Sequence, residues 1–158
     1  MFRQFLIGAA ALSTVATLSI LPAAADEAME KAVKARQGLF QVYAFNLGQL
    51  GAMAKGKVEF DAEAAQNAAD NLLAATSMKG GAMWPQGSDN TGAMKGKTRA
   101  KAEAWTTWPA IAKNSEDMVV AAKALAENAG TLDGIKANIA DVGQACKACH
   151  EKYRAKDF

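Results

Sequence analysis

The chain contains very few of the side chains that most often bind metal ions or act as nucleophiles. Among its 158 residues there are two cysteines and one histidine. A structural zinc site needs four ligands, so carboxylates would have to supply any that these three residues do not. Chemistry that depends on cysteine and histidine must therefore be sought where these residues occur together.

A strong excess of charge of one sign is also missing. The chain has 18 basic and 16 acidic residues, and one of the basic residues, Arg3, lies near the N-terminus. No basic run carries the interleaved aromatic side chains that are typical of nucleic-acid binding. This balance argues against nucleic acid and against strongly acidic partners.

The alternation of apolar and polar residues that is typical of β-strands is absent as well. Valine, isoleucine and threonine never form an alternating run, whereas alanine, lysine, glutamate, leucine and methionine are abundant. Most of these abundant residues are strong helix formers. The composition therefore predicts an all-α protein.

The N-terminal residues 1–25 have the pattern of a secretory signal peptide. Arg3 supplies the positive start, residues 5–21 are largely apolar, and Ala23, Ala24 and Ala25 offer a cleavage site of small residues. An uncleaved N-terminal anchor is the alternative, because the apolar run is as long as a short membrane span. With cleavage, residues 26–158 form one domain of a periplasmic protein that has no stable membrane insertion.

Both cysteines and the histidine fall within five consecutive positions, Cys146-Lys147-Ala148-Cys149-His150. On a helix, residues i, i+3 and i+4 lie on the same face, so Cys146, Cys149 and His150 point in one direction. Two thiols can then attach to the two vinyl groups of one haem while the imidazole reaches the iron. This is the C-x-x-C-H pattern of covalent haem c attachment.

Three other interpretations of the motif explain less. A thioredoxin-like redox pair requires a preceding strand in a chain rich in strands. Zinc would need carboxylate ligands. A disulfide within one helical turn would be strained and gives His150 no role.

One histidine also limits the chemistry of the haem iron. It excludes a second c-type haem and a bis-histidine haem, so the sixth position is filled by methionine, by a weaker ligand, or by nothing. The methionines that could supply sulfur are Met53, Met78, Met83, Met94 and Met118.

Four helices are predicted, over residues 27–55, 61–78, 98–128 and 132–156, with a glycine-containing loop over residues 79–97. Asp61 and Thr131 are suitable N-caps. The third helix is expected to bury Trp105 and Trp108 and to kink or break at Pro109. Four such helices predict an antiparallel four-helix bundle with haem inserted at one end.

A C-x-x-C-H motif on the last helix of an exported four-helix chain resembles the cytochrome c′ family. The similarity covers essentially the whole chain after residue 25, and four segments carry it: residues 35–40, 53–56, 60–62 and 142–154. The most specific of them combines Gly143, Cys146, Cys149, His150, Tyr153 and Arg154.

The resemblance implies roles for three further residues. Phe40 matches the position over the sixth face of the iron, where low-spin relatives carry a ligating methionine. Arg36 matches a basic residue near a haem propionate, and Arg154 matches a basic residue on the histidine side. Without the resemblance, Phe40 would be a core residue and both arginines solvated charges.

The resulting functional prediction is a periplasmic mono-haem c-type cytochrome that transfers single electrons to redox partner proteins. With Phe40 unable to ligate iron, a high-spin five-coordinate haem that binds NO or CO is expected. The alternatives are a dedicated nitric oxide protein and a low-spin, Met-ligated carrier; an enzyme is not expected. The family's antiparallel-helix dimers, together with Ala65, Ala68 and Ala69, suggest a homodimer.

Overall fold

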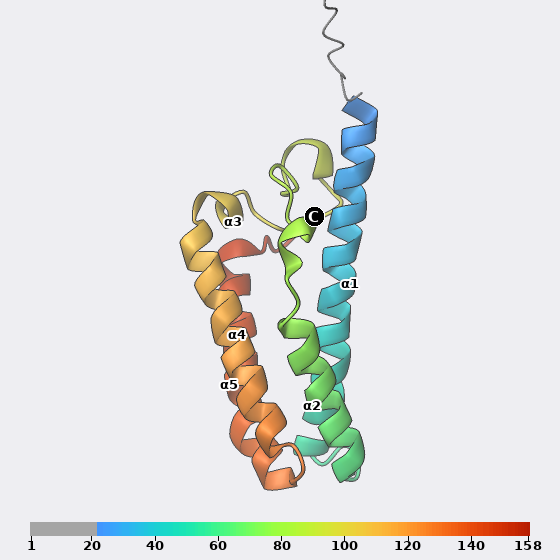
Figure 1. Ribbon diagram of the computed structural model, residues 1–158, viewed down its shortest axis with the longest axis vertical. Coiled ribbons are helices and arrows are strands. Elements are labelled where there is room, and N and C mark those ends of the chain that lie inside the picture. The colour runs from blue at the N-terminus through green and yellow to red at the C-terminus, as the bar shows by residue number, and fades with distance from the viewer. Residues whose placement is uncertain (1–21) are drawn as a thin grey trace, which may run out of the picture.

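The computed structural model describes residues 22–158, and helices form most of this part of the chain (Figure 1). The elements are α1 (Pro22–Ala54), α2 (Ala62–Thr76), the short 3₁₀ helices η1 (Gly80–Met83) and η2 (Gly92–Met94), α3 (Glu103–Thr106), α4 (Trp108–Asn128) and α5 (Leu132–Tyr153). The predicted signal peptide lies outside the described residues except for its last four, which begin α1.

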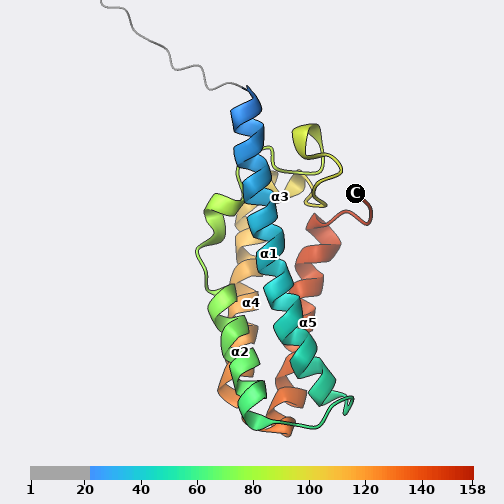
Figure 2. The same ribbon diagram turned by 90° about the vertical axis from the view of Figure 1, so that its right-hand side faces the viewer.

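The four long helices form the predicted bundle. Helix α1 packs on α2, α2 on α4, α4 on α5, and α5 on α1, so each long helix has two neighbours. Figures 1 and 2 show α1 and α2 joined at one end of the molecule, where α4 also turns into α5. The glycine-containing loop and the C-terminus lie toward the opposite end. The all-α fold class is therefore confirmed.

Two predicted caps fix where helices begin. The Asp61 side chain accepts a hydrogen bond from the Ala64 amide at 2.9 Å, and Thr131 accepts one from the Gly134 amide at 3.1 Å. Each satisfies a backbone N–H that has no partner within the helix. Beyond the caps, the helices bury an apolar stripe whose fully buried members include Leu50, Leu72, Leu125, Ile135 and Val142.

The third predicted helix differs from the structure at its start. Residues 98–102 are not helical, and the segment forms the short α3 before Thr107 adopts φ −117°, ψ 40°. Pro109 then lies in the first turn of α4, where the missing N–H of proline costs nothing. The expected break is thus present, one residue before Trp108, and it separates two helices.

The fourth predicted helix is shorter than expected. Helix α5 ends at Tyr153, and Arg154 is extended at φ −113°, ψ 124°. Ala100 and Arg154 form an isolated antiparallel bridge, supported by hydrogen bonds from Lys101 N–H to the Tyr153 carbonyl and from Ala155 N–H to the Arg99 carbonyl. The pairing of residues 99–101 with residues 153–155 provides partners for backbone N–H and C=O groups, so neither segment needs to be helical.

Two burial predictions were wrong. Trp108 is 50% exposed, because its side chain borders a cavity rather than the bundle core. Ala65, Ala68 and Ala69 are fully buried inside the bundle, so they cannot form a dimer surface. Small side chains there let the α2 backbone approach its neighbours closely.

Within the described part of the chain, no helix has the combination of length and apolar character that crossing a membrane requires.

Candidate functional site

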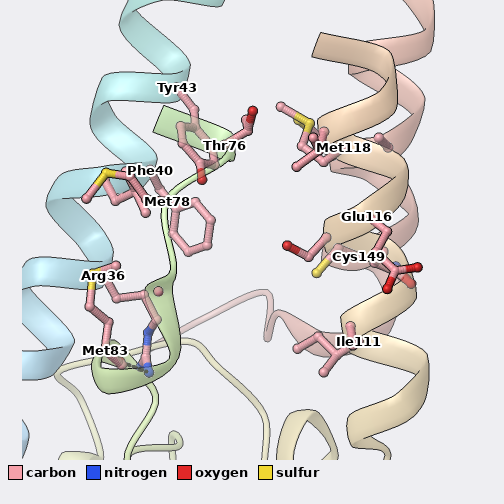
Figure 3. A pocket seen from close by; sticks show the side chains of 18 of the residues that line it. Arg36, Phe40, Tyr43, Thr76, Met78, Met83, Ile111, Glu116, Met118 and Cys149 are labelled. Carbon is pink, nitrogen blue, oxygen red and sulfur yellow. Dashed lines mark hydrogen bonds between the residues drawn. The ribbon is translucent and has the colours of Figure 1, made fainter. Parts of the chain in front are cut away.

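A largely apolar cavity of about 660 Å³ opens between α1 and the α4–α5 pair. Figure 3 shows Arg36, Phe40 and Tyr43 of α1 on one side, with Ile111 and Met118 of α4 and Cys149 of α5 facing them. The segment that follows α2, which carries Met78 and Met83, runs along the α1 side. The volume lies within the range of small-molecule and cofactor sites.

The two cysteines and the histidine line this cavity together. Cys146, Cys149 and His150 project from one face of α5, as their spacing predicted, and both cysteines are free thiols of intermediate exposure. Burial raises the pKa of both thiols, so each is protonated at neutral pH. Cys146 Sγ lies 3.9 Å from Met118 Sδ, which places the first thiol against the α4 wall.

Phe40 faces His150 across the cavity. Their ring centroids are 6.4 Å apart and the ring planes are nearly perpendicular. Phe40 is 41% exposed, although it continues a stripe whose member one heptad earlier, Val33, is fully buried. The reason is that its ring borders the cavity. Phe40 also contacts Tyr43 and Trp84 edge-to-face, at 5.6 and 6.4 Å.

Arg36 is buried beside the cavity with only 3% of its surface exposed. Its guanidinium donates to the Met83 carbonyl, to the hydroxyl and carbonyl of Ser88 and to the Thr98 hydroxyl, at 2.9 to 3.1 Å. Its Cζ also lies 4.3 Å from the centre of the Trp84 ring. Burial lowers the pKa of Arg36 to about 10, so the side chain remains charged at neutral pH. No carboxylate within 4 Å pairs with it in the described chain.

A second cavity of about 500 Å³ reaches His150 from the side of the C-terminal segment. Arg36, Arg99 and Arg154 all line it, together with Tyr153 and Phe158. Arg154 is exposed, and its N–H donates to the His150 carbonyl at 3.1 Å. Partial burial of the imidazole, and then the positive charge of Arg99, lower the pKa of His150.

The five candidate methionines separate into two groups. Met78, Met83 and Met118 line the first cavity. Met53 is buried in the bundle core, and Met94 is buried without bordering either cavity. A sulfur ligand, if there were one, would therefore come from the first group.

Three further residues line the two cavities without having been predicted as site residues: Tyr43, Trp84 and Arg99. Tyr43 lies three residues after Phe40, so helical spacing could have found it. Arg99 and Trp84 lie in segments without helical periodicity. Their positions depend on long-range contacts, such as the hydrogen bond from Trp105 Nε1 to the Trp84 carbonyl.

These residues fit a covalently held haem. The first cavity is apolar and of suitable volume, two thiols and an imidazole open into it from one helix face, and an aromatic ring lies opposite. Among the described residues no group of three or more cysteine, histidine and carboxylate side chains could hold a bare metal ion. Two thiols and one imidazole that open into one cavity suit an iron that is carried within a covalently attached macrocycle.

Comparison with known sequences leads to the same cofactor. The family model of cytochrome c′ matches residues 31–154. Cytochrome c-554 of Cereibacter sphaeroides is 40% identical over 80 residues, which are 49% of this chain and 52% of that protein. Cytochrome c′ of the same organism is 39% identical over 89 residues, 56% of this chain and 58% of that protein. The chain thus spans little more than half the length of these curated relatives.

Solved structures match this chain over a larger share of its length than the curated sequences do. The cytochrome c′ from Rhodobacter spheriodes superposes with a TM-score of 0.77 at 32% identity, over 81% of this chain and 98% of that one. A cytochrome c′ described as having ligand-controlled dimer dissociation superposes with a TM-score of 0.74 at 33% sequence identity, over 81% of this chain and 97% of that chain. A carbon monoxide-bound cytochrome c′ variant from Alcaligenes xylosoxidans superposes with a TM-score of 0.70 at 28% sequence identity, over 81% of this chain and 97% of that chain. Family model, fold and site composition agree, and the chain belongs to the cytochrome c′ family of haem c-type cytochromes.

Proposed function

We propose that this chain carries a single haem, bound covalently by Cys146 and Cys149, with His150 as the axial ligand of the iron. The observation that carries the proposal is that both thiols and the imidazole open from one face of α5 into an apolar cavity. The chain contains no further cysteine or histidine, so a second haem of this kind could not be attached.

The α1 wall of the cavity determines what the opposite side of the haem can do. Haem iron cycles between ferric and ferrous states and, where a position is open, binds small gases. Leu39, Phe40 and Ala44 on this wall cannot ligate iron or move a proton. The Tyr43 hydroxyl on the same wall donates to the Ala75 carbonyl at 3.2 Å. The Thr76 hydroxyl donates its proton to the Leu73 carbonyl at 2.9 Å, so toward another partner it can act only as an acceptor.

These features support single-electron transfer by a high-spin, five-coordinate haem that also binds CO or NO. The similarity to a CO-bound cytochrome c′ variant supports the gas-binding part. We do not propose catalysis of peroxide or oxygen chemistry, because that chemistry needs free polar groups opposite the histidine, whereas the Arg36 and Tyr43 side chains on that wall donate hydrogen bonds to other groups of the protein. We place the protein in the periplasm, on the evidence of the predicted signal peptide.

The similarity to a cytochrome c′ with ligand-controlled dimer dissociation supports a homodimer. Since Ala65, Ala68 and Ala69 are buried in the bundle, the surface must lie elsewhere. The outer face of α1, where Val42 and Phe45 are exposed, is our proposed site.

Two measurements on the purified holoprotein test the haem proposal. Denaturing acid–acetone extraction should leave haem on the wild-type polypeptide and release it from the Cys146→Ser/Cys149→Ser variant. The ferrous absorption spectrum should be that of a high-spin haem and should change when CO is added. Free extraction of haem from the wild type would refute covalent attachment.

A low-spin carrier with a methionine ligand is the second candidate, since Met78, Met83 and Met118 line the cavity. It predicts sharp low-spin ferrous bands that CO does not alter. The Met78→Leu, Met83→Leu and Met118→Leu variants would then identify the ligand, because only one of the three should convert the spectrum to high-spin.

A further inference from the structure

The nearly balanced charge of the whole chain conceals a local concentration of positive charge. The antiparallel contact between residues 99–101 and 153–155 brings together two short segments that are far apart in sequence. Five basic residues lie on these segments or next to them, and we call this group the basic rim: Arg99, Lys101, Lys152, Arg154 and Lys156.

Direct contacts show that members of the basic rim are neighbours. Lys101 Nζ donates to the Lys152 carbonyl at 3.1 Å, and an Arg99 guanidinium nitrogen donates to the Lys156 carbonyl at 3.2 Å. Lys152, Arg154 and Lys156 are exposed, while Arg99 and Lys101 are partly buried.

No member of the basic rim forms an ion pair in the described part of the chain, whereas lysines elsewhere do. The nearby Glu151 pairs with Lys147 at 3.6 Å. The Asp157 carboxylate offsets part of the charge of these five basic residues, and a net positive surface remains. Such a surface attracts negatively charged partners over roughly a Debye length, about 10 Å at 0.1 M salt.

The position of the basic rim connects it to the proposed function. Arg99 and Arg154 line the second cavity, whose other lining residues include Cys149 and His150. A partner that docks on the basic rim would therefore approach the proposed haem from the His150 side. The second cavity thus connects His150 with a surface that carries positive charge.

We propose that the basic rim is the docking surface for an acidic face of a redox partner protein. The proposal rests on the proposed electron-transfer function and names the chemistry of the partner. It also revises the expectation, drawn from total charge, that no strongly acidic partner is involved. Complementary charges of this kind mainly accelerate encounter, so the rate of association should depend steeply on salt.

Oxidation of the ferrous holoprotein by small ions of opposite charge tests this surface. With ferricyanide, one electron leaves the iron and ferrocyanide is formed; with tris(phenanthroline)cobalt(III), the same electron reduces cobalt(III) to cobalt(II). The wild-type rate with the anion should fall as salt is added, and the rate with the cation should not. Lys152→Glu/Lys156→Glu should lower the low-salt ferricyanide rate by about tenfold.

The matched control is Lys57→Glu/Lys136→Glu, which changes the net charge equally at the end of the bundle where α1 meets α2 and α5 begins (Figure 1). It should leave the ferricyanide rate within about twofold of wild type. Equal effects of the two double variants would overturn the docking proposal and leave electron transfer intact. Failure of both oxidants to react would instead refute the proposed function.

A binding measurement that is independent of the haem redox state completes the test. Fluorescence anisotropy should show labelled poly-L-glutamate binding to the wild type and to the control variant, and much weaker binding to Lys152→Glu/Lys156→Glu. Binding to anionic phosphatidylglycerol vesicles without binding to poly-L-glutamate would overturn the proposal in favour of a membrane surface.

Discussion

Phe40 is the residue on which access to the proposed sixth coordination position depends. Phe40→Ala should speed CO binding to the ferrous protein, because the ring that faces His150 at 6.4 Å is removed. Since the ring borders the cavity that the proposed haem would fill, the loss in unfolding free energy of the holoprotein should be roughly 3–5 kcal/mol, as for a buried ring. Stopped-flow CO mixing and urea unfolding measure these effects. Unchanged CO kinetics would place the gas on another face.

The buried guanidinium of Arg36 joins α1 to the glycine-containing loop, so replacing it should lower the stability of the fold. Arg36→Lys keeps the charge but cannot reach all four acceptors, and it leaves the buried Ser88 and Thr98 hydroxyls short of partners. We expect a loss of about 2–4 kcal/mol in unfolding free energy. Lys31→Ala, on the exposed face of the same helix, should stay within about 0.5 kcal/mol of wild type. Equal stability of both variants would contradict this role.

Between elements, an ion-pair cluster holds the start of α1 against the same loop. Glu30 accepts from Lys97 at 2.8 Å and pairs with Lys34 at 3.0 Å, and these two partners lower its pKa from 4.5 to about 2. The folded state therefore binds this proton less tightly than the unfolded chain. The stabilisation is complete above pH 4.5 and is lost as the pH falls toward 2.

Glu30→Gln should consequently lose less stability than wild type between those two pH values. Urea midpoints at low ionic strength are the appropriate measurement, because the pair is exposed and salt screens it. Glu59→Gln is the control, since Glu59 forms no ion pair in the described part of the chain. A wild-type pH profile in Glu30→Gln would show that the cluster does not contribute.

At the scale of the whole molecule, we expect the outer face of α1 to form the interface of a homodimer. Phe45 is 69% exposed, and Val42, one turn earlier, is exposed as well. Phe45→Glu should convert a dimer at micromolar concentration into a monomer, because a carboxylate would be buried at the interface without a partner. Val120→Glu on α4 is a matched control that should remain dimeric. Light scattering distinguishes the two, and a monomeric wild type would remove the prediction.

The sequence determined those features of this protein that depend on local spacing. The i, i+3, i+4 spacing of Cys146, Cys149 and His150 requires one helix face whatever the surroundings. Asp61 and Thr131 accept hydrogen bonds from helix N–H groups only a few residues away, and Pro109 disrupts the helix through its own ring. Helix content, the bundle class and the motif at the proposed haem site were therefore predictable.

Only the tertiary structure decided which side chains face the cavity and which face the core. Trp108 and Phe40 lie on apolar stripes, yet they border an open cavity, because the walls of α1 and α4 are separated there; Ala65 and its neighbours occupy the tightly packed interior. The extended pairing of residues 99–101 with 153–155 ends α5 early and concentrates positive charge near His150. Both outcomes arise from contacts between residues that are distant in sequence. Helical periodicity and total charge carry no information about such contacts, so neither outcome could be predicted from them.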